Sequence, residues 1–442
     1  MFKEDLKNKV VEAINTSAEE IIHIGDQIYK HPELGYKEFK TTKTVVDYLK
    51  NLDLEVEENI ALTGCRSYLN KGHKGPRIAL MGELDAIVVK DHPDSDAEGV
   101  VHACGHNIQI AGLLGAVAGL VRSGVLSQLD GQVDILAVPS EEFIELEYRD
   151  QLRSEEKIKF FGGKQELISR GYFDDIDMSL MFHSLDLEDK EALVGPTSNG
   201  FIGKKVQFTG RESHAGSAPE LGVNALNAAM LAIMNIHAQR ETFLDSDRVR
   251  VHPIITKGGD IVNVIPSDVR MEAYVRARTI DAMIDANHKV SRALLAGASA
   301  VGANIEITDI PGYLPILKHD GMDDLFHENL KLLGCEGKIV EGGDFSGSFD
   351  FGDVSHLMPT LHPMIGGVRG SIHTKDFAII DKNLAYILPA KAMALTIIDL
   401  LYDGAEIAKS ILDNFTPTLE KATYLSLMEE NMNTLIVTNM TS

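Results

Sequence analysis

Three clusters of polar residues lie at or near the ends of short apolar runs between residues 79 and 142, and they constrain the fold more than any other feature. The clusters are Gly-Glu-Leu-Asp at residues 82–85, His-Ala-Cys-Gly-His-Asn at residues 102–107 and Pro-Ser-Glu-Glu at residues 139–142. Asp, His, Cys and paired Glu are residue types that bind metal ions and transfer protons. The pattern therefore predicts buried strands whose ends carry a polar site.

Strands and helices are expected to alternate around these clusters. Apolar runs at residues 77–81, 133–138 and 180–182 predict strands, whereas residues 3–30, 39–52, 108–121 and 384–402 have the pattern of helices. This alternation indicates an α/β domain with a largely parallel sheet. Ligands of such sheets bind at the carboxyl ends of the strands, which is where Asp85, Glu141, Glu142 and His183 fall.

Residues 198–312 have a different pattern, which predicts an inserted domain. Its expected strands and helices follow one another in the order β-α-β-β-α-β, which is typical of a ferredoxin-like α+β fold. The α/β pattern resumes after Pro311, so residues 1–197 and 313–442 are expected to form one discontinuous domain. A chain of 442 residues is also too long for one ordinary core. A short helix at residues 419–428 and a polar end at residues 431–442 look peripheral.

The overall composition is that of a soluble enzyme, and we expect it in the cytoplasm. The net charge of -24 argues against nucleic acid and anionic membranes as partners. No window approaches about 18 uninterrupted apolar residues, and the first residues lack the pattern of a signal peptide. The three cysteines match neither a zinc ribbon nor a disulfide framework.

Each candidate metal ligand has an ordinary structural alternative when it is considered alone. Cys104 and His106 suit zinc-like ions, but they also fit a buried thiol beside a histidine that caps a helix. The adjacent glutamates at 141 and 142 suit a ligand beside a general base, or simply the exposed start of a helix. His183, His373 and, in the inserted domain, His214 also fit structural roles.

As a set, these side chains are more informative. Five ligand-type residues at strand ends would suffice for two metal ions a few ångströms apart, with a bridging water within reach of Glu141. Such a pair of ions polarises a carbonyl group and lowers the pKa of the water, and amide hydrolysis requires both effects.

The motifs resemble those of the co-catalytic metallopeptidases that include aminoacylase, carboxypeptidase G and bacterial amidohydrolases. The resemblance runs from His-Pro-Glu-Leu-Gly at residues 31–35 to His-Thr-Lys-Asp-Phe at residues 373–377. Its most specific parts are His-Ala-Cys-Gly-His, Pro-x-Glu-Glu, Ser-His-Ala-Gly with Gly-Val-Asn-Ala-Leu, and Val-Asn-Val-Ile-Pro. Asn107 follows Cys-Gly-His, and in this respect the chain is similar to the subgroup of p-aminobenzoyl-glutamate hydrolase and its dipeptidase-like relatives.

The resemblance implies two divalent ions per subunit, Zn²⁺ or Mn²⁺. It implies Glu141 as the general base and Asp85 as the residue that orients a ligand. It also implies that the inserted domain is a lid that forms a homodimer, in which His214 stabilises the oxyanion in the partner subunit's site. The implied metal ligands are Cys104, His106, Glu142, His183 and His373, and the implied substrate contacts are Asn263 and Arg276.

The implied reaction is hydrolysis of small amides such as N-acyl amino acids, aminobenzoyl-glutamate-like compounds or dipeptides, with metal-bound hydroxide attacking the carbonyl. One alternative is a non-catalytic subunit that keeps the fold and binds a small amide or peptide. Another is a peptidase for longer peptides, which a lid over the site should exclude.

Three departures from the family pattern bear on this expectation. Asn107 and Gln109 replace the Asp and His of better-known amidohydrolases, which would alter metal occupancy. Residues 143–159 replace the usual glycine-rich run after the paired glutamates, and this acidic loop would disfavour a second acidic group on the substrate.

Overall fold

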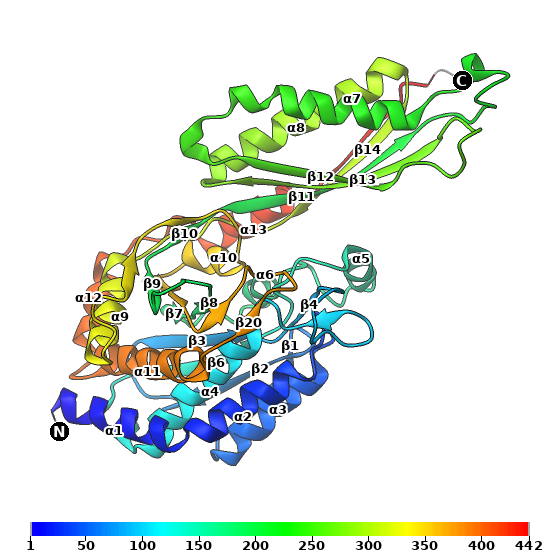
Figure 1. Ribbon diagram of the computed structural model, residues 1–442. Coiled ribbons are helices and arrows are strands. Elements are labelled where there is room, and N and C mark those ends of the chain that lie inside the picture. Colours follow the sequence, from blue (N-terminus) through cyan, green and yellow to red (C-terminus); the bar gives the residue numbers. More distant parts are fainter. Residues whose placement is uncertain (1, 441–442) are drawn as a thin grey trace. The chain divides into compact units, whose positions relative to one another are not determined.

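The computed structural model describes residues 2–440, which form two compact units (Figure 1). The first unit runs from the beginning of the described chain to Thr197 and continues through Leu317–Asp344 and Asp353–Thr418. The second contains Ser198–Ile316, Phe345–Gly352 and the chain from Leu419 onward. The second unit therefore differs from the predicted inserted segment, residues 198–312, chiefly in including the C-terminal tail.

A six-stranded sheet forms the centre of the first unit. The segment from β6 through β3 and β7 to β17 is parallel, whereas β1, β2 and β6 pair in antiparallel fashion. Every residue of β6 is buried, as expected for a parallel strand that is covered on both faces. In spatial order the strands are β1 (Val56–Ile60), β2 (Gly64–Leu69), β6 (Gln132–Val138), β3 (Arg77–Glu83), β7 (Met178–Leu180) and β17 (Thr360–Leu361).

Helices surround this sheet, and α4 is the most deeply buried of the long ones. Fifteen consecutive residues of α4 are buried, which explains why its sequence is small and apolar on every side. It packs against α1, α2 and α11. The helices of the first unit are α1 (Lys3–Thr16), α2 (Ala18–Tyr29), α3 (Phe39–Asn51), α4 (His106–Arg122), α5 (Leu146–Ser154), α6 (Gly163–Ser169), α9 (Asp320–Leu332), α11 (Leu388–Leu401) and α12 (Glu406–Asn414), and the short α10 (Phe351–Ser355) crosses into it from the second unit.

The helix predicted for residues 3–30 is in fact two helices. The hydroxyl of Ser17 donates a hydrogen bond to the carbonyl oxygen of Ala13 (3.0 Å), and Ser17 lies between α1 and α2. A serine that bonds to the preceding turn competes with continued helix, which accounts for the break.

One stretch, Asn383–Leu401, is apolar and long enough to cross a membrane, but 83% of its most apolar window is buried. It begins as a π-turn (Asn383–Ile387) and continues as α11, a core helix of the first unit.

A second, four-stranded sheet of the first unit contains the strand of His183. Its order is β15 (Ile339–Glu341), β9 (Ala192–Val194), β18 (Met364–Ile365) and β8 (His183–Ser184). The described chain also contains three two-stranded ribbons: β4 (Ile87–Val88) with β5 (Val100–Val101), β10 (Thr197–Ser198) with β16 (Asp344–Phe345), and β19 (Val368–Arg369) with β20 (Ala378–Ile379).

The second unit has the predicted β-α-β-β-α-β order, and its strands form one antiparallel sheet. Helices α7 and α8 lie side by side on one face of this sheet (Figure 1). The sheet order is β12-β13-β11-β14-β21. The bounds are β11 (Gly200–Thr209), α7 (Ala225–Ala238), β12 (Arg250–Lys257), β13 (Asp268–Ala277), α8 (Ile280–Val301), β14 (Asn304–Pro311), α13 (Lys421–Glu430) and β21 (Thr434–Val437).

The C-terminal tail is the clearest difference from the predicted fold. Residues 431–442 were expected to be a polar, peripheral end of the first domain, but β21 pairs with β14 of the second unit, from Ile305 opposite Val437 to Thr308 opposite Thr434. Backbone groups of an edge strand are free to take up another strand, and the tail satisfies those of β14.

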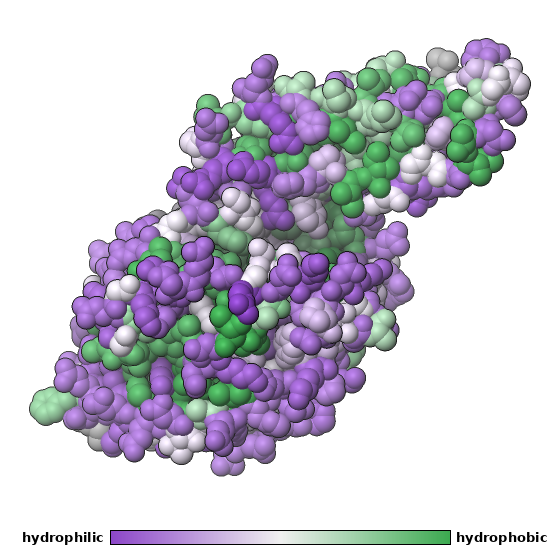
Figure 2. Space-filling model, in the orientation of Figure 1, coloured by the Kyte–Doolittle hydropathy of each residue, from purple (hydrophilic) through white to green (hydrophobic). Residues whose placement is uncertain are grey.

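Apolar side chains are exposed on the second unit, whereas the visible face of the first unit is mainly hydrophilic (Figure 2). Within the described chain the outer edge of β12 carries no further strand. The exposed apolar residues of α7 and β12 are Met230, Leu231, Met234, Ile254 and Ile255.

Candidate metal centre

The ends of β3 and β6 lie at the same edge of the central sheet, because these two strands are parallel neighbours. Asp85 follows β3, and Glu141 and Glu142 follow β6. Gly105 separates Cys104 from His106 and has φ of 84°, and a Cβ there would lie 2.1 Å from the hydroxyl oxygen of Ser184. Glycine is therefore required for the turn that presents both ligand candidates.

The structure brings the five predicted ligands together around Cys104. Its Sγ lies 3.4 Å from Nε2 of His183 and 3.3 Å from Nε2 of His373. Nε2 of His373 also lies 2.9 Å from Oε1 of Glu142. Two groups of potential ligand atoms share Cys104, and within each group all atoms lie within 4.8 Å of one another: Cys104, His106 and His183 form the first, and Cys104, Glu142 and His373 the second.

These distances fit a metal ion. Sulfur and nitrogen ligands of one tetrahedral zinc ion lie roughly 3.5 Å apart, given Zn–S of about 2.3 Å and Zn–N of about 2.0 Å. In addition, Nε2 of His106 is buried and makes no hydrogen bond within the described chain, although a carboxylate oxygen of Glu83 lies 3.1 Å away. A buried nitrogen that faces a carboxylate without a hydrogen bond is stabilised by a cation, so the donor set suits a metal ion.

Asp85 orients two members of the cluster. Nδ1 of His106 donates to the carbonyl oxygen of Asp85 (2.8 Å) and lies 3.2 Å from its Oδ1, while the backbone N–H of Glu142 donates to its Oδ2 (2.8 Å). Because Nδ1 of His106 is engaged, Nε2 is left for the metal. Nδ1 of His183 is held in the same way, 2.7 Å from the carbonyl oxygen of Ser184. Such partners fix the orientation of ligating imidazoles.

The cluster gathers negative charge and is ready to accept cations. Burial alone would raise the pKa of the Cys104 thiol, but the neighbouring imidazoles of His106, His183 and His373 lower it to about 6. Burial likewise opposes ionisation of Glu142, yet His373 holds the pKa of this carboxyl at about 2. Burial lowers the pKa of His373, whereas Glu142 and Cys104 raise it to about 11. The neighbouring imidazoles therefore favour the anionic forms of Cys104 and Glu142, which are the forms that bind metal ions.

Glu141 lies beside the cluster on a strained loop. Its Oε2 is 3.9 Å from Nε2 of His106, and the preceding residue, Ser140, has φ of 57°. Oε1 of the buried Glu38 accepts the backbone N–H of Ser140 (2.7 Å) and thereby holds this loop. A non-glycine residue at positive φ persists only where the surroundings enforce it, and Glu38 supplies that constraint.

One carboxylate of the cluster, Glu83, is absent from the predicted site. It ends β3, is fully buried, and its Oε2 lies 3.1 Å from Nε2 of His106. Oε1 of Glu83 accepts a hydrogen bond from Nζ of the buried Lys164 (2.5 Å), and Oε2 accepts one from the side-chain amide of Gln109 (2.7 Å). The Glu-Leu-Asp sequence contains the residue, but the lysine partner is 81 positions away along the chain.

The structure assigns different places to the two substituted positions. Gln109 holds Glu83, as described above. The side chain of Asn107 instead donates to the carbonyl oxygen of Gly25 (3.3 Å) and to the hydroxyl of Tyr386 (3.1 Å). Asn107 therefore takes part in packing between α2 and the start of the C-terminal core helix and is not one of the grouped ligand atoms.

The loop that replaces the usual glycine-rich run is folded around Arg149 of α5. This guanidinium is buried and donates to the carbonyl oxygens of Glu142 and, at 2.9 Å, of Phe161. It thus ties both ends of the insertion to the candidate site. Several acidic residues of the loop have basic partners: Glu145 pairs with Lys37, Asp150 with Arg153 and Glu155 with Lys157.

The three remaining predicted residues, His214, Asn263 and Arg276, belong to the second unit. The loops of the first two meet, since the N–H of Ala215 donates to the carbonyl oxygen of Asn263 (2.9 Å) and His214 forms a bridge with Val264. Arg276 lies on β13 and donates to the hydroxyl of Ser348 (2.7 Å).

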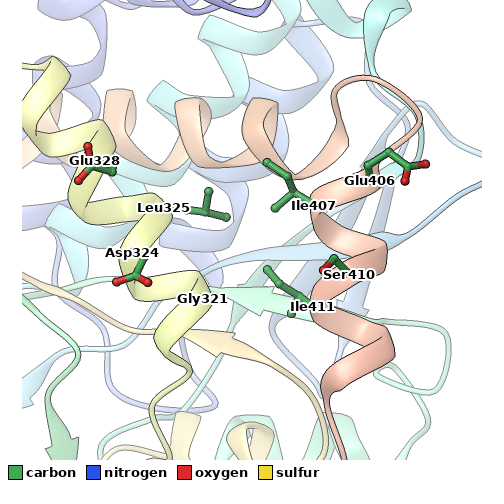
Figure 3. A pocket seen from close by; sticks show the side chains of 8 residues that line it. All are labelled: Gly321, Asp324, Leu325, Glu328, Glu406, Ile407, Ser410 and Ile411. Carbon is green, nitrogen blue, oxygen red and sulfur yellow. The ribbon is translucent and has the colours of Figure 1, made fainter.

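A separate groove of about 410 Å³ lies between α9 and α12 (Figure 3). Leu325, Ile407 and Ile411 face it, with Asp324, Glu328 and Glu406 at its margin. None of the predicted site residues lines it.

Comparison with known proteins supports a relationship over most of the chain. Residues 197–301 match the peptidase dimerisation domain of M20 type. The chain is 28% identical over 424 residues to the Xaa-Arg dipeptidase of Mus musculus, with 90% of each protein covered. It is 26% identical over 374 residues to thermostable carboxypeptidase 2 of Saccharolobus solfataricus, with 82% of this chain and 89% of that protein covered.

Solved structures show the same fold. The YxeP protein of Bacillus subtilis, described as a dinuclear metal-binding peptidase of the M20 family, superposes with a TM-score of 0.66 at 20% identity and covers 88% of this chain and 99% of its own. The aminobenzoyl-glutamate utilization protein of Klebsiella pneumoniae gives a TM-score of 0.65 at 17% identity, with 88% and 97% covered.

These comparisons confirm the resemblance that the motifs predicted. The chain is a homologue of the M20-type metallopeptidases and amidohydrolases, and it is an enzyme of this metallohydrolase class.

Proposed function

We propose that this enzyme hydrolyses small amides with two divalent metal ions, Zn²⁺ or Mn²⁺. The observation that carries the proposal is the pair of ligand groups that share Cys104, with Glu141 beside them. The first group, with His106 and His183, would hold one ion, and the second, with Glu142 and His373, would hold the other.

The ions would polarise the amide carbonyl and lower the pKa of a water molecule. Glu141 would accept a proton from this water and return it to the leaving amine. Its position is fixed by the loop that Glu38 restrains, so its carboxylate faces the cluster without reorganisation. Asp85 keeps His106 and Glu142 in register by three contacts, and it would preserve this geometry while charge moves.

The proposed substrates are N-acyl amino acids, aminobenzoyl-glutamate-like amides and dipeptides. The mouse relative is named for Xaa-Arg dipeptides, so a dipeptide with C-terminal Arg belongs in the first panel. A basic group also suits the acidic loop at residues 143–159, although several of its carboxylates are already paired with basic side chains.

The test is amine release from this panel by the protein loaded with Zn²⁺ or with Mn²⁺. We expect turnover of at least one class, and loss of about 10²-fold or more in Glu141→Gln, which should still bind both ions. Glu147→Gln, on the exposed face of the adjacent helix, is the matched control. Full activity in metal-loaded Glu141→Gln would refute the assignment of the base. Tight amide binding without turnover would favour the non-catalytic alternative. Two features of the sequence motivated that alternative, Asn107 and the altered loop at residues 143–159, and the first no longer supports it because Asn107 contacts Tyr386.

We further propose that the second unit is a ferredoxin-like lid that forms a homodimer. The match to a dimerisation domain, the free edge of β12 and the exposed apolar residues of α7 and β12 support this proposal. In such a dimer His214 would stabilise the oxyanion in the partner subunit's site, and Asn263 and Arg276 would contact the substrate.

Complementation tests the exchange of His214. A mixture of His214→Ala chains with Glu141→Gln chains should recover about one quarter of wild-type activity, because half of randomly formed dimers contain one complete site. A mixture as inactive as its components would contradict the role in trans, and a monomer in light scattering would contradict the dimer.

We also expect the enzyme to act in the cytoplasm, where its free thiols Cys65, Cys104 and Cys335 would stay reduced. Fractionation of the native cell tests this, and recovery of the protein only outside the cytoplasm would contradict it.

A further inference from the structure

Glu83 and His106 face each other in a way that requires a positive charge between or beside them. Nδ1 of His106 is engaged by the carbonyl oxygen and carboxylate of Asp85, so the imidazole proton resides there in the neutral form. The remaining nitrogen, Nε2, then presents a lone pair to Oε2 of Glu83 at 3.1 Å. Two lone pairs at this distance repel each other unless a proton or a metal ion binds both.

The distance fits two ligands of one ion. Metal–nitrogen and metal–oxygen bonds of about 2.0–2.2 Å place cis ligands roughly 3.0–3.4 Å apart. Glu83, His106 and Glu141 form a third group in which one potential ligand atom of each residue lies within 4.8 Å of the others, and all three residues are buried.

The surroundings hold the Glu83 carboxylate rigidly in this place. Gln109 donates to Oε2 (2.7 Å) and accepts the backbone N–H of Glu83 (3.1 Å), so the side chain and the end of β3 are fixed together. Lys164 neutralises Oε1 (2.5 Å). Each carboxylate oxygen has about two lone-pair directions, so Oε2 keeps one that is directed toward the metal cluster.

We propose that Glu83 is a further ligand of the ion held by His106, and that the two metal positions are consequently unequal. This inference rests on the proposed function. The ion held by His106 then gains a carboxylate ligand from Glu83, which forms a group with His106 and Glu141. The second position has three protein ligands, Cys104, Glu142 and His373, which leaves room for water or substrate.

The exposure of the ligands agrees with this division. His106, His183 and Glu83 are fully buried, whereas 43% of the His373 side chain is exposed. The ion of the second position should therefore exchange faster and bind more weakly than the ion of the first.

A charge-balanced double variant, Glu83→Leu with Lys164→Met, tests the proposal. It removes both carboxylate oxygens of Glu83 without leaving a buried lysine unpaired, and unpaired buried charge is what usually unfolds such variants. Metal-free wild type and double variant are titrated with Co²⁺ against a competing chelator, and the visible Co²⁺ spectrum reports the coordination of the first ion. We expect the first ion to bind about 10- to 100-fold more weakly in the double variant, with an altered spectrum.

The matched control is Lys204→Met with Asp309→Asn, which removes another buried ion pair of the same length, 2.5 Å, in the second unit. It should bind both ions as the wild type does. If the double variant does not fold, Glu83→Asp keeps the charge pair while withdrawing the oxygen by one methylene, and it should weaken the first ion in the same way.

The outcomes are distinguishable. Wild-type affinities and spectrum in the double variant, or in Glu83→Asp, would show that Glu83 is only the structural partner of Lys164 and would overturn the inference, leaving the proposed function intact. Wild-type protein that binds no ion would refute the proposed function itself.

Discussion

Replacement of Arg149 by Met should weaken both the fold around the candidate site and its affinity for metal. The guanidinium donates to the carbonyl oxygens of Glu142 and Phe161, and both bonds are buried. Hydrogen bonds to charged groups contribute about 1.5–3 kcal/mol each to stability. Methionine also removes the cost of burying the charged guanidinium, which offsets part of the loss of these bonds. We therefore expect Arg149→Met to cost about 2–4 kcal/mol of stability.

The metal affinity should fall because one of these bonds holds the backbone of a ligand. If metal binding must restore the position of Glu142 at a cost of about 1.5–3 kcal/mol, affinity drops about 10- to 150-fold. The metal affinity of Arg149→Lys should lie between those of the wild type and Arg149→Met, since one ammonium group cannot reproduce the two-armed geometry of a guanidinium.

The assay combines urea unfolding of metal-free protein with chelator competition for Zn²⁺. Arg153→Met is the control: it lies on the same helix, but its pair with Asp150 is partly exposed and contributes about 1 kcal/mol or less. Equal losses of stability and metal affinity in Arg149→Met and Arg153→Met would show that Arg149 does not support the metal centre.

Three further predictions concern charge and sheet edges. Burial and Asp85 raise the pKa of Glu38 from 4.5 to about 8, so the folded chain retains a proton that the unfolded chain loses, and stability contributed by this group falls between these pH values. Over this range the free energy of unfolding of the metal-free wild type should fall by up to about 1.4 kcal/mol per pH unit more than that of Glu38→Gln. Parallel pH profiles of the two proteins would contradict this. A chain ended after Thr418 should self-associate in size-exclusion chromatography through the bared edge of β14, whereas one ended after Val437 should not. Lys204→Met should lose about 3–5 kcal/mol in urea unfolding because it leaves Asp309 buried without its charge partner, and adding Asp309→Asn should restore most of that loss.

Strands β3 and β6 of the central sheet were predictable because they are buried on both faces and therefore have apolar sequences. The predicted runs at residues 77–81 and 133–138 became β3 and β6, and the polar residues after them lie at one edge of the sheet. By contrast, β21 contains only four residues, and nothing in the local pattern shows that its partner, β14, lies about 130 positions earlier in the chain.

The candidate site divides in the same way. Cys104, His106 and the paired glutamates occur in compact motifs, so their convergence could be inferred from spacing and resemblance. Glu83 has the right residue type, but its function depends on contacts with Gln109 and Lys164 that only the tertiary fold creates.

The insertion and the substituted asparagine were harder to interpret from sequence. Charged residues at 145–159 suggested an acidic loop, yet Arg149 turns inward and the flanking charges pair locally. Asn107 follows the metal-binding motif in sequence, but α4 rotates its side chain toward Tyr386 because neighbouring helical residues point in different directions.

The proposed function is tested most directly by the metal content of the purified, active enzyme, measured after dialysis against Zn²⁺ or Mn²⁺. We expect two ions per chain, one of which is lost readily to a chelator together with amidase activity. Fewer than one ion per chain with both metals, or full activity after both ions have been removed, would contradict the proposed function.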